Sequence, residues 1–142
     1  MNLSKSFLVL VVLFSIIFAF HQKAFGENWI IYSTSANGIK EYIDKDSVVI
    51  ISSSVKRVWR KTIMPIEIFL KVSGLPSEDY ASYDHSISFN EIDCKKRTTK
   101  LLQLIHYGKN GSTIRSIKDP NPEPIFVVPG SVGEDFFKAI CR

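Results

Sequence analysis

The segment from Pro129 to Arg142 constrains the fold of this chain most, because it joins a short helix to one of only two cysteines. Pro129 and Gly130 interrupt the preceding structure, and Ser131 followed three residues later by Glu134 has the pattern of a capping box at a helix start. Apolar residues then recur at helical spacing, at Val132, Phe136 and Ile140. A helix of about ten residues is marginally stable alone in water, so we predict that this one packs on the rest of the chain.

Residues 1–26 have the pattern of a secretory signal peptide. Lys5 supplies a positive start, residues 7–20 form an apolar run broken once by a serine, and Ala24 and Gly26 are the small residues expected before a cleavage site. The apolar run is about fourteen residues long, whereas roughly 20 are needed to span a bilayer. We therefore predict cleavage after Gly26 and an exported protein with no membrane span; the alternative is an uncleaved N-terminal anchor.

Removal of that segment leaves residues 27–142, which is long enough for a single domain with one core. The formal net charge of the whole chain is +4, and it falls by two to +2 because the removed segment carries Lys5 and Lys23 but no acidic residue. So small a positive charge gives no support to nucleic-acid binding, which a strongly basic surface would indicate. We expect no nucleic-acid partner.

Export also decides how the two cysteines are interpreted. In an oxidising compartment two cysteines most simply form one disulfide, here Cys94–Cys141. The chain-entropy model assigns about 4 kcal/mol of stability to closing a loop of roughly fifty residues. Two free thiols, or pairing between chains, are the alternatives. The histidines of the exported part, His85 and His106, show no metal-ligand spacing with these cysteines, so we predict no metal site.

Most of the exported part consists of short apolar, β-prone runs separated by turn residues, which is typical of antiparallel sheets. We interpret the fold as α+β, mainly β, with an antiparallel sheet of about six strands and a C-terminal helix held on it by the disulfide. Asn110-Gly111 between two runs is a hairpin signal, and the prolines within residues 119–124 exclude regular structure there. The apolar runs cover residues 29–32, 39–43, 48–51, 55–64, 66–72, 86–93, 98–107, 112–117 and 125–128.

An ordered set of motifs along nearly the whole exported part resembles a known family. The set comprises Tyr42-Ile43-Asp44-Lys45-Asp46-Ser47, Val58-Trp59, Glu91-Ile92-Asp93-Cys94, Tyr107 before the turn at 108–111, and Pro129-Gly130-Ser131 with Glu134 and Cys141. In this order it resembles the surface-adhesin protein E family of Gram-negative bacteria.

The resemblance implies an antiparallel sheet whose concave face holds a C-terminal helix through a disulfide between Cys94 and Cys141. It also implies an adhesin that binds host matrix or serum proteins and that can form a homodimer. Two features differ from the family pattern. Adhesin members are lipoproteins, whereas no cysteine near Gly26 could accept a lipid, so we predict a periplasmic or secreted protein. Phe126 stands where relatives often hold a tryptophan.

Catalysis has little support in the sequence. There is no G-x-S-x-G elbow, no phosphate-binding loop and no dinucleotide fingerprint, and we predict that the chain has no nucleophile–base pair. We interpret His106, in the apolar run 98–107, as a strand histidine with a satisfied partner and not as a general base. We therefore expect no enzyme activity, no catalytic residue and no cofactor.

The candidate protein-binding surface consists of Trp59 and the four basic residues around it: Lys56, Arg57, Arg60 and Lys61. Strand alternation places Lys56 and Arg60 on one face and Arg57, Trp59 and Lys61 on the other. Cations at this position would steer an acidic partner toward the surface. The alternative is that these charges protect an exposed strand edge from aggregation.

We therefore predict an exported, non-catalytic binding module of the cell envelope, adhesin-like, whose partner is a host or envelope protein. The competing hypothesis is a small periplasmic enzyme or ligand carrier that uses the groove between the sheet and the helix. An apolar groove with converging polar groups would favour that hypothesis, whereas the basic strand and the missing catalytic set favour the first.

Overall fold

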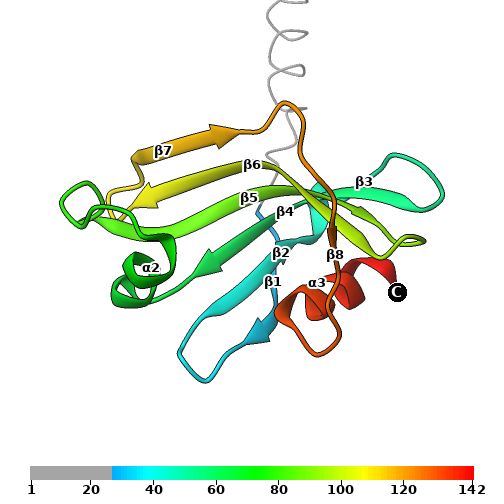
Figure 1. Ribbon diagram of the computed structural model, residues 1–142, viewed down its shortest axis with the longest axis horizontal. Coiled ribbons are helices and arrows are strands. Elements are labelled where there is room, and N and C mark those ends of the chain that lie inside the picture. The colour runs from blue at the N-terminus through cyan, green and yellow to red at the C-terminus, as the bar shows by residue number, and fades with distance from the viewer. Residues whose placement is uncertain (1–26) are drawn as a thin grey trace, which may run out of the picture.

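The computed structural model describes residues 27–142, so the predicted signal peptide over residues 1–26 lies outside the described residues. This part of the chain contains eight strands, two α-helices and one short 3-10 helix (Figure 1). In chain order they are β1 (Trp29–Thr34), β2 (Lys40–Asp44), η1 (Lys45–Ser47), β3 (Val49–Ile50), β4 (Val55–Ile63), α2 (Ile66–Ser73), β5 (Tyr83–Asp93), β6 (Thr98–Gly108), β7 (Thr113–Lys118), β8 (Ile125–Phe126) and α3 (Val132–Cys141).

The strands form one antiparallel sheet in the order β1-β2-β4-β5-β6-β7, and the two-residue strands β3 and β8 pair with β4 and β6. The prediction of an antiparallel sheet of about six strands with a C-terminal helix is confirmed. The central strands β4 and β5 pair without interruption, from Val55 opposite Asp93 to Ile63 opposite His85. Because β4 has paired neighbours on both sides, the interpretation of its charges as edge protection is wrong.

Both α-helices pack on the same face of the sheet, at opposite ends (Figure 1). Phe136 of α3 packs with Val58 of β4, and the Phe69 ring of α2 lies 5.2 Å from the His106 ring of β6. The register of β4, β5 and β6 places Val58 and His106 on one face. Neither of the two described α-helices packs on the other face, which we call the open face.

The run at residues 66–72, which we placed among the β-prone runs, forms the helix α2 instead. Its apolar side chains Ile66, Phe69 and Leu70 have helical spacing and pack into one cluster with Tyr80 and Tyr83. Gly74 ends the helix, because its left-handed backbone (φ 65°) lets its N–H reach the carbonyl of the last turn at Leu70. An apolar run as short as residues 66–72 is compatible with either a strand or a helix, and its packing with Tyr80 and Tyr83 fixes the helix.

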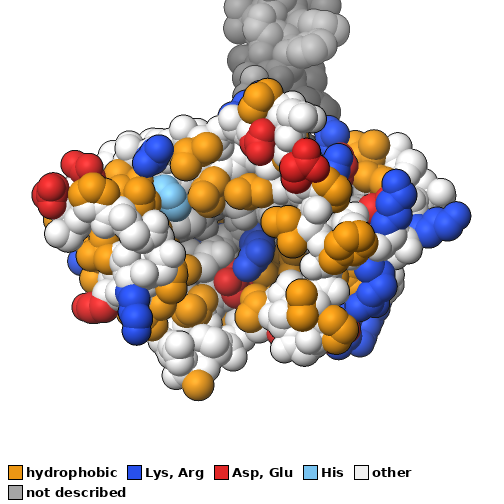
Figure 2. Space-filling view, viewed as in Figure 1, with side chains coloured by type: hydrophobic (Ala, Val, Ile, Leu, Met, Phe, Trp, Pro, Cys, Tyr) orange, Lys and Arg blue, Asp and Glu red, His pale blue; other side chains and the backbone are white. Residues whose placement is uncertain are grey.

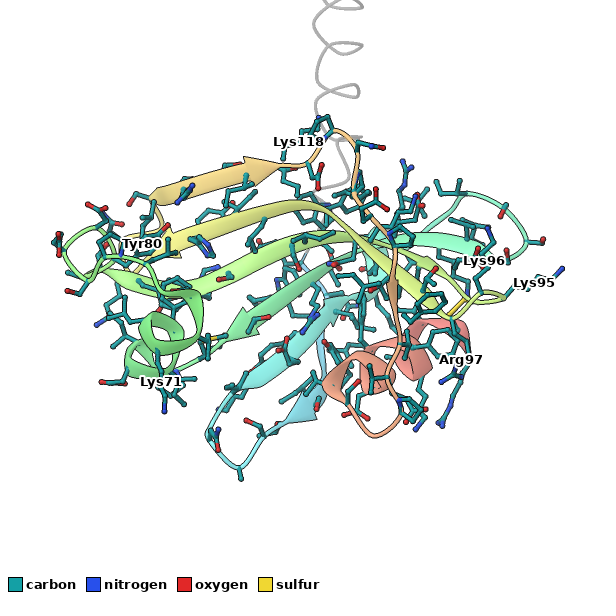
Figure 3. The ribbon with its side chains drawn as sticks, viewed as in Figure 1. Lys71, Tyr80, Lys95, Lys96, Arg97 and Lys118 are labelled. Atoms are coloured by element: carbon teal, nitrogen blue, oxygen red, sulfur yellow. A yellow bond between two sulfur atoms is a disulfide. The ribbon has the colours of Figure 1, made fainter. Side chains whose placement is uncertain are left out.

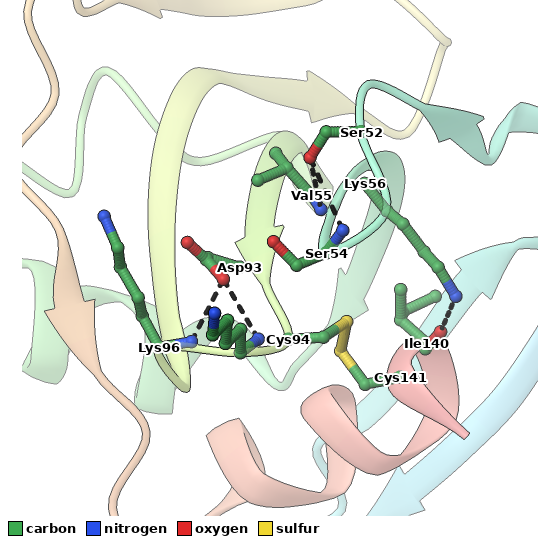
Figure 4. The surroundings of a disulfide bond; sticks show 10 residues. Ser52, Ser54, Val55, Lys56, Asp93, Cys94, Lys96, Ile140 and Cys141 are labelled. Carbon is green, nitrogen blue, oxygen red and sulfur yellow. Dashed lines mark hydrogen bonds between the residues drawn. A yellow bond between two sulfur atoms is a disulfide. The ribbon is translucent and has the colours of Figure 1, made fainter.

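The C-terminal helix α3 covers the other end of this face, and the predicted disulfide holds it there (Figure 4). Cys94 and Cys141 are bonded to each other, with their Cα atoms 5.6 Å apart. The two alternatives, free thiols and pairing between chains, are therefore wrong. Phe136 is buried against Val58 and Ile92. Burial of a side chain of this size stabilises the fold by about 1.5–3 kcal/mol.

The start of α3 shows how its cap is built. Ser131 is the N-cap, and its hydroxyl accepts a hydrogen bond from the N–H of Glu134 at 3.3 Å. The Glu134 carboxylate reaches back one residue further than in a standard capping box, because it accepts from the N–H of Gly130 at 2.9 Å. It also pairs with Arg97 and Lys138, each at 3.2 Å. These contacts lower the pKa of Glu134 to about 2, with the Gly130 hydrogen bond as the largest cause.

Candidate binding surface

The structure divides the predicted basic surface between the two faces of the sheet. Lys56 and Arg60 lie on the face that carries the helices, and Arg57, Trp59 and Lys61 lie on the open face, as strand alternation predicted. The Lys56 ammonium donates to the carbonyl of Ile140 in α3 at 2.7 Å (Figure 4). Lys56 therefore holds the terminal helix and is not brought together with Arg57.

Arg60 also makes internal contacts. Its guanidinium forms a two-pronged ion pair with the buried carboxylate of Glu41, through Nε at 3.0 Å and Nη2 at 3.0 Å. The Thr62 hydroxyl donates to the same carboxylate at 2.7 Å. Figure 2 shows acidic and basic atoms on the floor of the hollow between α2 and α3. Because the Glu41 carboxylate and the Arg60 guanidinium neutralise each other, this pair offers little free charge to a ligand.

The open face centres on two stacked aromatic rings. Trp59 of β4 and Phe89 of β5 are cross-strand partners whose ring centroids lie 4.8 Å apart, with an interplanar angle of 30°. Both side chains are partly exposed. Stacked pairs of this kind contribute about 0.5–1.5 kcal/mol beyond the area that they bury, so the pair forms a rigid aromatic platform.

Two cations flank this platform and are held in place. Arg57 pairs with Glu91 at 2.8 Å. The Lys61 ammonium lies 4.3 Å from the centre of the Trp29 ring and 5.6 Å from that of Tyr42, within the range of cation–π attraction. Partial burial lowers the pKa of Lys61. Both cations are thus held by neighbouring side chains and remain accessible from the open face.

Two shallow hollows meet at the platform. One, of about 450 Å³, includes Trp29, Trp59, Phe89 and Tyr107 among its lining residues. The other, of about 530 Å³, shares Trp59 and Phe89 and extends past Arg57 to the 119–122 segment. Both volumes fall in the range of small-molecule sites, but the hollows are broad and run into each other. We call this region, with Arg57, Trp59, Lys61 and Phe89 at its centre, the platform surface.

The sequence prediction missed Phe89, Trp29 and Tyr107 as members of this surface. Alternation along β5, which puts Phe89 on the same side as Glu91, is the signal that could have indicated it. Trp59 and Phe89 can be placed together only when it is known that β5 pairs with β4, and in which register.

One pairing corrects the statement that the chain has no nucleophile–base pair. The Ser86 hydroxyl lies 2.9 Å from Nδ1 of His106, and the Tyr83 hydroxyl lies 2.9 Å from that of Ser86. All three side chains are buried, and the rings of Phe69 and Tyr80 close the group off. Because no substrate could reach it, we interpret the group as structural, and His106 has the satisfied partner that the sequence predicted.

Within residues 27–142, no three His, Cys, Asp or Glu side chains gather as metal ligands. The same part of the chain holds no helix that is long and apolar enough to cross a membrane. The sheet with both α-helices on one face, the terminal helix held by a disulfide and the aromatic platform on the other face together define a small β-rich domain.

The comparison with protein families agrees with that class. The family model for surface-adhesin protein E matches residues 29–142, nearly the whole described chain, and the chain belongs to that family. The resemblance seen in the sequence motifs is therefore confirmed. A search of curated proteins found no match. The description of the family names a surface adhesin.

Proposed function

We propose that this chain is exported and acts as a non-catalytic, adhesin-like binding module of the cell envelope. Its partner is a host or envelope protein that docks on the platform surface. One observation carries the proposal: the stack of Trp59 on Phe89 is partly exposed, on a sheet face that neither described α-helix covers, between Arg57 and Lys61. Membership of an adhesin family supports it.

The chemistry of the platform suits a protein partner. Tryptophan and arginine are enriched among the residues that dominate binding energy at protein interfaces. Because Arg57 is held by Glu91 and Lys61 by two rings, these cations lose little conformational freedom when a partner docks. Their charge adds attraction for a partner that carries carboxylates.

Export rests on the signal-peptide pattern before Glu27, and the disulfide supports it, because disulfides persist in oxidising compartments. Intact-mass measurement of the protein from the envelope and medium fractions tests it. A chain that begins at Glu27 is expected. A chain that retains Met1, or one confined to the cytoplasm, would contradict export.

Affinity capture tests the partner. Protein 27–142 and its Trp59→Ala variant are used as parallel baits on envelope and host extracts, with Val72→Ala as the control. Val72 is an exposed apolar residue of α2, 68% accessible, on the face opposite the platform. We expect a protein that is retained by the unchanged bait and by the control but lost with Trp59→Ala. Equal retention of every captured protein by all three baits would contradict the proposal.

A further inference from the structure

Large apolar side chains are unusually exposed at one end of the molecule. Ile50 in β3 is 72% accessible and Phe126 in β8 is 74% accessible, while Ile125 and Val128 beside it are 63% and 62% accessible. Exposed apolar groups next to polar ones mark sites of interaction with proteins or membranes. These side chains therefore mark a candidate interaction site.

Backbone hydrogen bonds join these apolar residues to a basic turn. The turn at residues 94–97 links β5 to β6. On one side the N–H of Cys94 donates to the Ser54 carbonyl at 2.7 Å, and on the other the Arg97 carbonyl accepts from the N–H of Val127 at 2.9 Å. Residues 49–54, 94–97 and 125–128 are thus contiguous, and we call them the tip.

The tip is cationic as well as apolar. Lys95 and Lys96 are exposed, and Figure 3 shows Lys95 projecting beyond the end of the sheet. The tip segments contain no aspartate or glutamate. The adjacent Asp93 carboxylate accepts hydrogen bonds from the backbone N–H groups of Lys95 and Lys96, each at 3.0 Å. It is therefore bound to the backbone of the turn and does not pair with the two ammonium groups in these contacts. In Figure 2, basic side chains gather at the right of the view, which is the end of the molecule that carries the tip.

We propose that the tip binds the surface of an anionic lipid bilayer. Exposed aliphatic and aromatic side chains enter the interfacial region of a bilayer, while lysines beside them are attracted to anionic headgroups. A protein partner fits less well, because lysine is depleted in protein interfaces. Val49 of the tip also lines one hollow of the platform surface, but the residues that carry this inference, Ile50, Phe126, Lys95 and Lys96, line neither hollow.

Vesicle binding tests the proposal with protein 27–142, which contains every described element and the disulfide. We expect binding to vesicles of phosphatidylglycerol mixed with phosphatidylcholine, no binding to phosphatidylcholine alone, and weaker binding at higher salt. Ile50→Ser with Phe126→Ser, and separately Lys95→Ser with Lys96→Ser, should each weaken binding by about tenfold or more.

Matched controls come from the opposite end of the molecule. Val72→Ser removes an equally exposed apolar group, and Lys40→Ser with Lys109→Ser removes two exposed cations that line a hollow beside α2. Both controls should leave vesicle binding unchanged. Equal loss in a control, or no preference for the anionic vesicles, would overturn the proposal.

A second measurement needs no variant and so avoids any effect on folding. Lysine acetylation of the unchanged protein, followed by mass spectrometry, should show Lys95 and Lys96 protected by anionic vesicles and Lys71 of α2 unprotected. Unprotected tip lysines, or equal protection of Lys71, would overturn the proposal. Capture of a protein at the tip without any vesicle binding would overturn it as well.

Discussion

Lys56 and Arg57 are neighbours in sequence but serve opposite sides of the sheet. Lys56 donates to the Ile140 carbonyl of the terminal helix, whereas Arg57 pairs with Glu91 on the open face (Figure 4 shows the first contact). A cluster that looks continuous in the sequence therefore separates into a half that makes internal contacts, Lys56 with Arg60, and a half that lies on the open face, Arg57 with Trp59 and Lys61.

Replacement of Lys56 should destabilise the fold. A hydrogen bond from a charged group contributes about 1.5–3 kcal/mol, and this one is partly exposed, so Lys56→Gln should lower the free energy of unfolding by about 1–2 kcal/mol. Chemical denaturation measures the change. Lys100→Gln, on strand β6 of the same sheet, is the control. A Lys56→Gln protein as stable as the parent would show that the contact with Ile140 carries no net stability.

Loss of the disulfide should release α3. Cys141→Ser should lower stability by about 2–5 kcal/mol and expose the apolar face of α3 that Phe136 and Ile140 form. Thermal unfolding with and without reductant measures the loss. The melting temperature of the reduced parent should match that of the variant. A parent protein whose melting temperature does not change when reductant is added would contradict the role of the bond.

Glu134 should make stability depend on pH in the acidic range. Its pKa in the folded protein is about 2, below the ordinary value of 4.5, so the carboxylate contributes stability above pH 4.5 that is lost as the pH falls toward 2. Glu134→Gln should therefore melt at a lower temperature than the parent at pH 7 and at the same temperature near pH 2. The exposed Glu123→Gln is the control. A Glu134→Gln deficit that persists at pH 2 would count against this assignment.

His106 should add a second pH dependence at higher pH. Burial, and the positive charge of Arg115, lower the pKa of His106 below its ordinary value of 6.5. The unfolded chain therefore takes up a proton below about pH 6.5 that the folded protein resists, so stability falls as the pH drops from there. His106→Asn should flatten the melting-temperature profile between pH 7 and 5. An unchanged slope would show that another group titrates there.

Much of the fold could be predicted from the sequence because its signals are local. The capping residues Ser131 and Glu134, the turn at Asn110-Gly111 and the alternation along β4 each depend on neighbouring residues. The run at 66–72 was ambiguous, because its helix is fixed by packing on Tyr80 and Tyr83, residues later in the chain. Whether such a run forms a helix or a strand can be decided only when the residues it packs against are known.

The candidate site was less predictable, because it depends on pairs far apart in the chain. Trp59 meets Phe89, Lys56 meets Ile140 and Ser86 meets His106 only once strand order and register are set. A one-residue change of register would exchange the faces of a strand. Charge near Trp59 could therefore be seen in the sequence, but not which half of it is free to bind.

The central claim is that the partner docks on the open face, and one comparison within strand β4 tests it most directly. The dissociation constant of the captured partner is measured for Arg57→Ser with Lys61→Ser and for Lys56→Ser with Arg60→Ser, beside the melting temperature of each. The first pair should weaken binding by about tenfold or more with little change in melting temperature, while the second should lower the melting temperature and leave the affinity of the folded protein unchanged. Weaker binding in the second pair alone, with the first pair binding like the parent, would place the partner on the helix-covered face and contradict the account.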